Sequence, residues 1–277
     1  MSKTVFCSVI FPANLPYFQD FIKSLKNQSD TNFTLLLFND GVADLEKYLR
    51  DSTLNYRIEN CQGTIPETRS QIFGYLKKAA FSKIIFGDTD DYFSENRVEE
   101  CKKLLNDFDV VANDLILVAN DKTILSELFW KNRKEIKQPI SLESIKTFNF
   151  LGLGNTAVNQ KILPNEIQFN SNLIAIDWYL FSVILQSPVS VVFSSNSHVF
   201  YRQHEANIIG RKKLTFADFR RGVDVKLNHY CTLALLYPDF KELANQIKEF
   251  KANLSEEKFN SIQKKQKVEN PFWWEEI

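Results

Sequence analysis

Strand-like and helix-like segments alternate along the first third of the chain, and this alternation constrains the fold more strongly than any other feature of the sequence. Each short apolar run typical of a buried strand is followed by a segment with apolar residues at helical spacing. The expected strands are 4–11, 33–38, 54–58 and 83–86, and the expected helices are 15–25, 44–49, 66–80 and 95–105. Repeated βα units predict an α/β fold, with a mostly parallel sheet flanked by helices.

The pattern becomes entirely helical after residue 215. Before that point we expect one or two strands in 110–118, separated by Asn113 and Asp114, a helix over 173–185 and a strand over 189–194. The helices expected beyond it are 216–236, 240–250 and 254–263. The sequence therefore predicts a sheet domain over residues 1–210 and a C-terminal helical extension over 211–277 packed on it.

Composition excludes several classes of function. The chain has 277 residues, and its 34 basic and 34 acidic side chains cancel, so no overall field attracts nucleic acid. The cysteines lack the paired spacing of a zinc or redox site, and we expect free thiols in a reducing compartment. They are Cys7, Cys61, Cys101 and Cys231. With no signal-peptide pattern and no apolar stretch of about 18 residues, the expected location is cytoplasmic.

A cluster of acidic residues follows the fourth expected strand. Gly87 opens a turn after that strand, and Asp88, Asp90 and Asp91 come within the next four positions. Neighbouring carboxylates repel one another, and a cation is the natural way to keep them ionised at neutral pH. Oxygen ligands favour Mg²⁺ or Mn²⁺, which bind through one or two carboxylates and substrate phosphates. The cluster therefore indicates a metal-dependent phosphate-ester site, and the alternative is a solvated Asp-rich turn.

The carboxyl ends of parallel strands meet at one edge of a sheet, where ligands bind in open α/β folds. Phe11 and Pro12 end the first expected strand, Asp40 ends the second, Thr64 follows the third, and the acidic cluster ends the fourth. We expect these residues to lie close together.

Seven short segments in this order resemble the family-2 nucleotide-sugar glycosyltransferases, which have the GT-A fold. The segments are 7–12, 38–41, 63–69, 86–91, 152–156, 176–178 and 201–210. The resemblance covers about residues 4–210 and leaves the helical extension outside.

The resemblance implies a role for each matching donor-site residue. Phe11, Pro12 and Asp40 match the positions that hold the nucleoside, and Thr64 and Arg69 belong to the donor-site segment. Asp88 and Asp90 match the metal motif, with Asp90 as the metal ligand, Asp88 nearer the ribose and Asp91 in support. Arg202 and Gln203 match a late loop that closes over the diphosphate, and His204 completes the metal shell. The implied cofactor is Mn²⁺ or Mg²⁺.

Asp177 matches the family's catalytic base, which takes a proton from the acceptor hydroxyl. Its apolar surroundings would raise its pKa and make it a better base. The implied reaction is a single displacement with inversion at the anomeric carbon. The alternative use of Asp177 is to cap the following helix. Asn39, Val42 and Ile176 depart from the family pattern, which bears on nucleobase preference and acceptor geometry.

The implied donor is a nucleoside-diphosphate sugar, with a UDP-sugar favoured, and the acceptor is a glycan or a lipid-linked molecule, as in polysaccharide or surface-glycan biosynthesis. Two other functions stay open. A binding module could keep the nucleotide-sugar pocket without transferring sugar. Residues 152–157 also fit the dinucleotide fingerprint of an NAD-dependent oxidoreductase, with Asp177 at about the expected distance.

The aromatic cluster at 271–274 offers two further contacts. Packing on the domain, or on a partner subunit of a homodimer, is favoured. The alternative is peripheral contact with the inner face of a membrane, aided by Lys264, Lys265 and Lys267.

Overall fold

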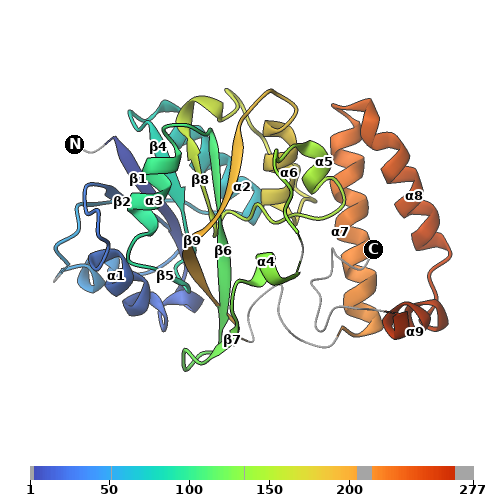
Figure 1. The fold of residues 1–277 in the computed structure, drawn as a ribbon, viewed down its shortest axis with the longest axis horizontal. Helices are drawn as coiled ribbons and strands as arrows, with labels where there is room; N and C mark the ends of the chain where they lie inside the picture. The colour runs from blue at the N-terminus through green and yellow to red at the C-terminus, as the bar shows by residue number, and fades with distance from the viewer. Residues whose placement is uncertain (1–2, 51, 134, 205–213, 266–277) are drawn as a thin grey trace.

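A nine-stranded mixed sheet runs through the part of the chain that the computed structural model describes, residues 3–50, 52–133, 135–204 and 214–265. The strand order is β3-β2-β1-β4-β8-β6-β9-β5, and β7 pairs with β6 beside this path. Figure 1 shows the sheet at the centre, with helices on both sides and α7–α9 stacked beyond α6. The strands are β1 (Thr4–Ile10), β2 (Thr34–Asn39), β3 (Tyr56–Asn60), β4 (Lys83–Phe86), β5 (Tyr92–Phe93), β6 (Val110–Val118), β7 (Ile124–Ser126), β8 (Thr156–Asn159) and β9 (Val191–Arg202).

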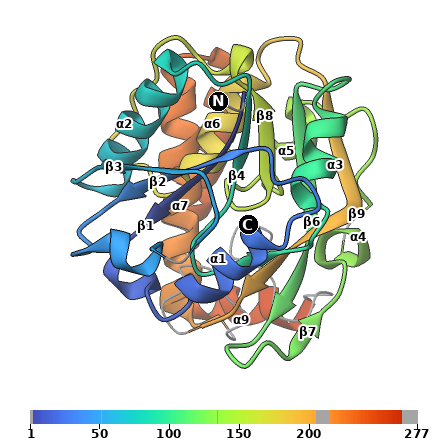
Figure 2. The same ribbon diagram turned by 90° about the vertical axis from the view of Figure 1, so that its left-hand side faces the viewer.

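The first four strands confirm the α/β prediction. β1 pairs in parallel with β2 and β4, and β2 pairs in parallel with β3. Six of the seven β1 residues are buried, as expected for a strand covered on both faces. In Figure 1, α1 (Phe18–Lys26) and α3 (Arg97–Leu104) cover one face, while α2 (Ile65–Lys78) and α6 (Ile176–Ile184) cover the other. In Figure 2, α1 and α3 lie toward the viewer and α7 lies behind the sheet.

The second half of the sheet is mixed. β8 lies between β4 and β6 and is antiparallel to both, whereas β6 and β9 are parallel. β6 is one continuous strand, and its register with β9 shifts between Asn113 and Asp114, the polar pair that suggested a break. β9 is likewise one 12-residue strand that absorbs the shift, and it runs beyond the strand expected at 189–194.

The dinucleotide fingerprint at 152–157 is wrong as a structural assignment. Such a fingerprint needs a strand before the glycines and a helix after them. Here the glycines lead directly into β8, an antiparallel strand. The segment therefore lacks the helix N-terminus that would receive a pyrophosphate.

Three helices form the C-terminal part of the described chain. They are α7 (Phe216–Ala234), α8 (Lys241–Ala252) and α9 (Glu256–Lys265). Buried residues of α7, including Tyr230 and Leu233, join the main core, while Phe219, Val223 and Phe259 form a second small cluster. The predicted boundary near residue 210 falls within 205–213, and the aromatic cluster at 271–274 also lies outside the described residues.

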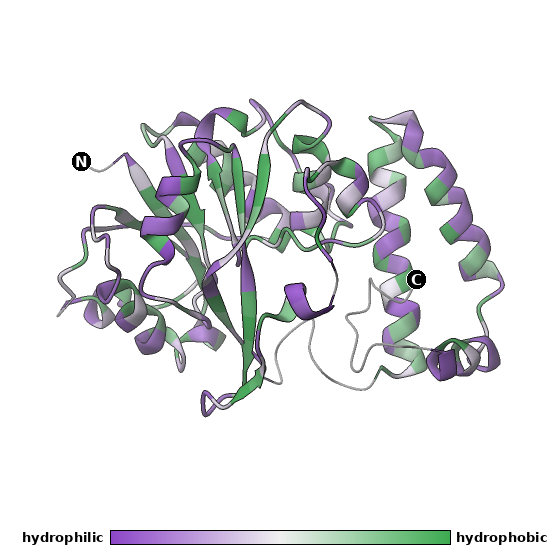
Figure 3. Cartoon of the chain, viewed as in Figure 1, coloured by the Kyte–Doolittle hydropathy of each residue, from purple (hydrophilic) through white to green (hydrophobic). Residues whose placement is uncertain are grey.

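The remaining helices connect these elements. They are α4 (Phe129–Arg133), α5 (Leu142–Ile145) and four 3₁₀ turns, η1 (Pro12–Asn14), η2 (Leu45–Tyr48), η3 (Gln160–Ile162) and η4 (Pro238–Phe240). The four cysteines are free thiols, as predicted. Figure 3 shows apolar strands in the interior and mostly polar residues along α8. Among the described helices, none has both the length and the apolar character needed to cross a bilayer.

Candidate active site

The loops that follow the parallel strands surround a cavity of about 560 Å³. This is the sheet edge at which the sequence placed its candidate residues. Those that line the cavity are Phe11, Asp40, Arg69, Asp88, Asp90, Asp91, Asp177 and His204. Pro12, Thr64, Arg202 and Gln203 do not contribute to its wall. The topology therefore brings most of the predicted residues together, although they are up to 193 positions apart along the chain (Phe11 to His204, 204 − 11).

The acidic turn after β4 is held by its central residue. The Thr89 hydroxyl donates to the Val9 carbonyl at 2.8 Å and accepts a hydrogen bond from the Asn14 amide at 3.0 Å. Thr89 is fully buried, whereas its neighbours Asp88 and Asp90 line the cavity. Successive side chains of the turn therefore alternate in direction: Thr89 is anchored in the protein, and the carboxylates on either side of it line the cavity.

The pKa values of two of the clustered acids are raised. Burial, and then the charge of Asp90, raise the pKa of Asp88 to about 6. Burial and the neighbouring carboxylates raise the pKa of Asp91 well above its ordinary value. Asp91 Oδ1 accepts the backbone N–H of Arg202 at 2.8 Å, while Oδ2 is buried with no hydrogen-bond partner among the described residues. The cluster therefore favours protonation of these acids, and a bound cation would favour their ionised forms instead.

Arg97 of α3 lies fully buried behind the acidic turn. Its guanidinium donates to the carbonyls of Phe86 at 2.7 Å and Gly154 at 3.2 Å. Burial lowers the pKa of Arg97 to about 10, against the opposing influence of the nearby acids, so the group is charged at neutral pH. No motif in the sequence distinguished this residue from an ordinary exposed helix arginine.

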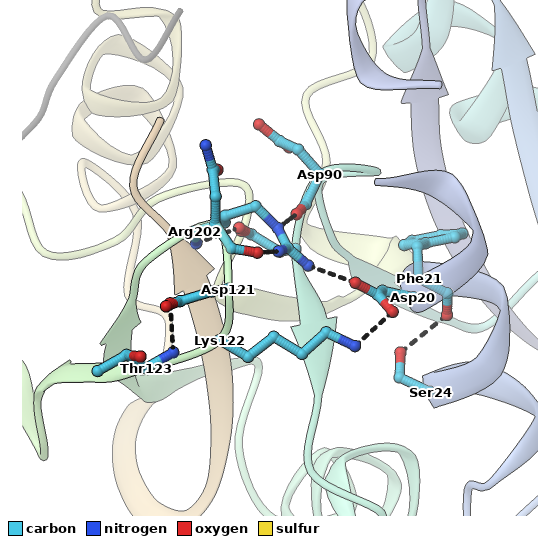
Figure 4. A network of polar contacts seen from close by, with 10 residues as sticks. Asp20, Phe21, Ser24, Asp90, Asp121, Lys122, Thr123 and Arg202 are labelled. Atoms are coloured by element: carbon cyan, nitrogen blue, oxygen red, sulfur yellow. Dashed lines mark hydrogen bonds and ion pairs between the residues drawn. The ribbon is translucent and has the colours of Figure 1, made fainter. Parts of the chain in front are cut away.

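Arg202 is a second buried arginine beside the cluster, with its side chain 1% exposed. It donates to Asp20 Oδ2 at 2.8 Å and to the carbonyls of Asp90 and Asn120, both at 2.9 Å. Figure 4 shows the contacts of Arg202 with Asp20 and Asp90, together with the Lys122–Asp20 ion pair. The resemblance implied a diphosphate ligand, whereas the structure gives this guanidinium protein partners that fix the backbone at Asp90. For Gln203, the backbone N–H donates to the Val118 carbonyl at 2.7 Å.

The structure brings His204 and Asp90 into direct contact. His204 Nε2 lies 2.9 Å from Asp90 Oδ2, and the imidazole stacks on Tyr17 with ring centroids 4.9 Å apart. Among the described residues, no group of three or more His, Cys, Asp or Glu side chains forms a complete ligand set. One or two carboxylates are sufficient for Mg²⁺ or Mn²⁺ when substrate phosphates supply further ligands. Asp88 and Asp90, whose carboxylates line the cavity, are therefore the oxygen ligands that such an ion would use together with substrate phosphates.

Asp177 lies in the first turn of α6 and is not its cap, since Ala175 occupies the N-cap position. Its Oδ1 accepts the Trp178 backbone N–H at 2.8 Å. Burial raises the pKa of Asp177, against the lowering influence of that hydrogen bond and of Arg69. The direction agrees with the expectation for a general base.

A glycine loop separates Asp177 from the acidic turn. A Cβ atom on Gly152 would lie 3.5 Å from Asp177 Oδ2, and one on Gly154 would lie 2.6 Å from Asp88 Oδ2. Asn155 holds this loop, because its side-chain oxygen accepts the Gly152 N–H at 2.9 Å. The absence of side chains at these two positions lets both carboxylates face the same space.

Part of the cavity wall is formed by exposed apolar side chains. Phe11 is 41% exposed and Ile65 is 56% exposed, and both line the cavity with Asp40. Thr64 is engaged elsewhere, because it forms a capping box with Glu67 at the start of α2. The departure at Asn39 has a structural use, since its side-chain oxygen accepts the Val42 N–H at 2.8 Å and braces the turn beside Asp40.

Sequence reasoning missed an aromatic wall on the β6–β9 side of the cavity, where Trp130 and Tyr201 lie. Trp130 lies in the first turn of α4, and the buried carboxylate of Asp114 holds that turn. That carboxylate accepts the backbone N–H groups of Trp130 at 2.8 Å and Lys131 at 3.2 Å. The one available signal was a charged residue within the otherwise apolar run at 110–118.

Comparison with solved structures identifies this arrangement. One similar structure is S. aureus TarS 1–349 in complex with UDP-GlcNAc, with 17% identity, a TM-score of 0.59, and coverage of 84% of this chain and 67% of that one. Another is the mannosyltransferase PcManGT from Pyrobaculum calidifontis in complex with GDP-Man and Mn²⁺, with 11% identity, a TM-score of 0.58, and coverage of 90% and 69%. The chain has the GT-A glycosyltransferase fold.

In a further crystal structure of TarS 1–349, the match covers 81% of this GT-A chain and 65% of that one, at 18% identity and a TM-score of 0.57. No protein-family model and no curated protein sequence matches this chain. The likeness therefore lies in the fold, and the chemistry of this GT-A chain has to be argued from its own cavity.

Proposed function

We propose that the protein is an inverting, divalent-metal-dependent glycosyltransferase that moves a sugar from a nucleoside diphosphate to a hydroxyl group. One observation carries the proposal: the carboxylates of Asp177 and Asp88 lie close to Gly152 and Gly154 of the same loop and line the same cavity. A base for the acceptor and a site for the donor phosphates therefore share one cavity.

The nucleoside end of the donor fits the rim formed by Phe11, Ile65 and Asp40. Exposed apolar side chains can cover the faces of a nucleobase, and a carboxylate can accept a hydrogen bond from a pyrimidine N–H. Arg69 contributes the positive charge on this part of the wall, where it can pair with phosphate oxygens. The TarS and PcManGT complexes with UDP-GlcNAc and GDP-Man support a nucleotide-sugar donor.

Asp88, Asp90 and His204 would hold Mn²⁺ or Mg²⁺. When bound, the ion supplies Lewis-acid stabilisation of the negative charge that develops on the leaving diphosphate. Arg202 supports this site indirectly. Its guanidinium donates a hydrogen bond to the Asp90 carbonyl, and its backbone N–H donates one to the Asp91 carboxylate. The complex of PcManGT with Mn²⁺ supports a metal-dependent reaction.

Asp177 takes the proton of the acceptor hydroxyl while the hydroxyl oxygen attacks the anomeric carbon. The bond from that carbon to the diphosphate oxygen breaks with its electron pair on the oxygen, so the configuration inverts in one displacement. A raised pKa brings Asp177 closer to the basicity that proton transfer at neutral pH requires. We place the acceptor, a glycan or a lipid-linked molecule, against the wall formed by Trp130 and Tyr201.

A nucleotide-sugar-binding module without catalysis is the second candidate, and it differs only in the role of Asp177. Calorimetry with UDP, GDP, UDP-GlcNAc and GDP-Man, with and without Mn²⁺, tests donor binding. Donor hydrolysis and transfer to a panel of saccharides test catalysis. We expect Asp177→Asn to bind donor as the wild type does and to lose transfer by about 10²–10⁴-fold. Wild-type transfer by Asp177→Asn would refute the base, and failure of every nucleotide to bind would refute both candidates.

A further inference from the structure

The residue after Asp177 is clamped by the helical extension. Trp178 is 1% exposed, and its indole stacks on the imidazole of His229 in α7 with ring centroids 4.0 Å apart and an interplanar angle of 20°. Tyr230 meets the same indole edge-on at 5.7 Å. On the α5 side, Trp178 Nε1 donates to the Ile145 carbonyl at 2.6 Å. These contacts leave the indole ring little freedom to turn or slide.

The clamp reaches the carboxylate through one peptide unit. The backbone N–H of Trp178 donates to Asp177 Oδ1 at 2.8 Å, so the position of Trp178 sets the direction of that hydrogen bond. The N-cap residue Ala175 offers no side chain to fix the first turn of α6. Side-chain contacts of Trp178 therefore replace the usual capping contact at the point where Asp177 faces the cavity.

His229 acts in this clamp as a flat ring. It is fully buried, and both ring nitrogens lack a hydrogen-bond partner among the described residues. The groups of α7 nearest to it are Lys226, whose Nζ lies 5.9 Å from the Trp178 ring, and Tyr230, whose hydroxyl donates to the Lys146 carbonyl at 2.8 Å. A histidine with no polar contact in the interior contributes its aromatic face to the stack, and that face lies on Trp178.

We propose that His229 is a positioning residue for Asp177, which makes α7 part of the catalytic apparatus. This inference rests on the proposed function, because it assigns Asp177 the role of base. The helical extension, which lies outside the sequence resemblance, is then required for the chemical step but not for nucleotide binding.

The test uses the full chain with His229→Ala, His229→Leu and His229→Phe. His229→Leu keeps a buried apolar side chain but has no flat ring. It therefore tests the loss of the stack even if His229→Ala does not fold. Val223→Ala is the matched control: Val223 is fully buried in the same helix, in the small cluster with Phe219 and Phe259. For each variant, UDP binding with Mn²⁺, kcat, donor KM and amide hydrogen exchange over residues 176–180 are measured.

We expect His229→Ala and His229→Leu to lower kcat by about 10–100-fold, as displacement of a reacting group by a fraction of an ångström does. Donor KM and UDP affinity should stay within about twofold, and His229→Phe should restore most of kcat. Amide hydrogen exchange at 176–180 should accelerate in His229→Ala and His229→Leu, and not in His229→Phe or Val223→Ala. Unchanged kcat in His229→Leu, or an equal loss in Val223→Ala, would overturn the positioning role. The exchange measurement requires no activity. It therefore tests whether the His229–Trp178 stack holds residues 176–180 even if the wild type transfers no sugar and the proposed function fails.

Discussion

His204 Nε2 lies 2.9 Å from Asp90 Oδ2, and both side chains line the cavity. The imidazole is also held by stacking on Tyr17. The contact joins the end of β9 to the turn after β4, two segments 114 residues apart in sequence. A pair fixed in this way can share one cation with little rearrangement.

The metal site predicts graded losses. Asp90→Asn should abolish Mn²⁺-dependent UDP binding, because it removes the carboxylate of the His204–Asp90 pair that faces the cavity. His204→Gln should weaken Mn²⁺ by about 10–100-fold, the usual effect of losing a partner at a metal site. Titration of Mn²⁺ followed by electron paramagnetic resonance measures both. His198→Gln is the control, since His198 of β9 lies outside the cavity wall. Equal Mn²⁺ affinities in His204→Gln and the wild type would remove His204 from the site.

The acidic turn predicts opposite pH trends with and without metal. Burial and Asp90 raise the pKa of Asp88 from 3.8 to about 6, so between these values the folded state holds the proton more tightly than the unfolded state. This group's contribution to stability is therefore present below pH 3.8 and is lost as pH rises through 6. Mn²⁺ binds the ionised form, so its stabilising effect should grow from pH 5 to pH 7.5. Thermal melts with and without Mn²⁺ at these two pH values provide the measurement, and a Mn²⁺ shift independent of pH would contradict the assignment.

Gly154 is predicted to be irreplaceable, whereas Gly74 is not. A Cβ on Gly154 would meet Asp88 Oδ2 at 2.6 Å, so Gly154→Ala must displace that carboxylate, lowering donor affinity by about tenfold or more and stability by about 1–3 kcal/mol. Gly74 lies within α2 with no atom within 4 Å of an added Cβ. Gly74→Ala should therefore gain about 0.5–1 kcal/mol and leave donor binding intact. Urea unfolding and UDP calorimetry distinguish the two variants, and unchanged donor affinity in Gly154→Ala would disprove the close approach.

Asp114→Ala should separate stability from donor binding. The change leaves the N–H groups of Trp130 and Lys131 without their acceptor, which costs about 1–3 kcal/mol. Because α4 carries Trp130 into the cavity wall, acceptor KM should rise while UDP affinity stays constant. Asp121→Asn, in an exposed turn on the same side of the sheet, should change neither quantity. A loss of UDP binding in Asp114→Ala would place α4 on the donor side of the cavity.

The sequence allowed β1, β2 and β4 to be predicted because each is a mostly apolar run that is almost entirely buried, whereas β3 is partly exposed and carries Arg57 and Glu59. It did not reveal β5, β7 and β8, which have two to four residues and depend on partners distant in the chain. Asp40 and Asp88 could be placed at one edge because parallel strands end at a common edge, whereas Asp177, on α6, was indicated only by the family resemblance. The partners of Arg97 and Arg202 could not be predicted, since a buried arginine and a surface arginine look alike in a sequence. The distinction arises only when helices and strands pack.

Arg97 and Arg202 give the acidic turn a permanent positive backing. Both guanidinium groups are enclosed by protein, and Arg97, with a pKa lowered to about 10 by burial, is charged at neutral pH. Carboxylates squeezed between fixed cations on the inner side and open space on the outer side present a one-sided electric field. Hydrogen bonds from both guanidinium groups run to protein carbonyls at either end of the turn, so the turn keeps its internal support whatever binds on its open side.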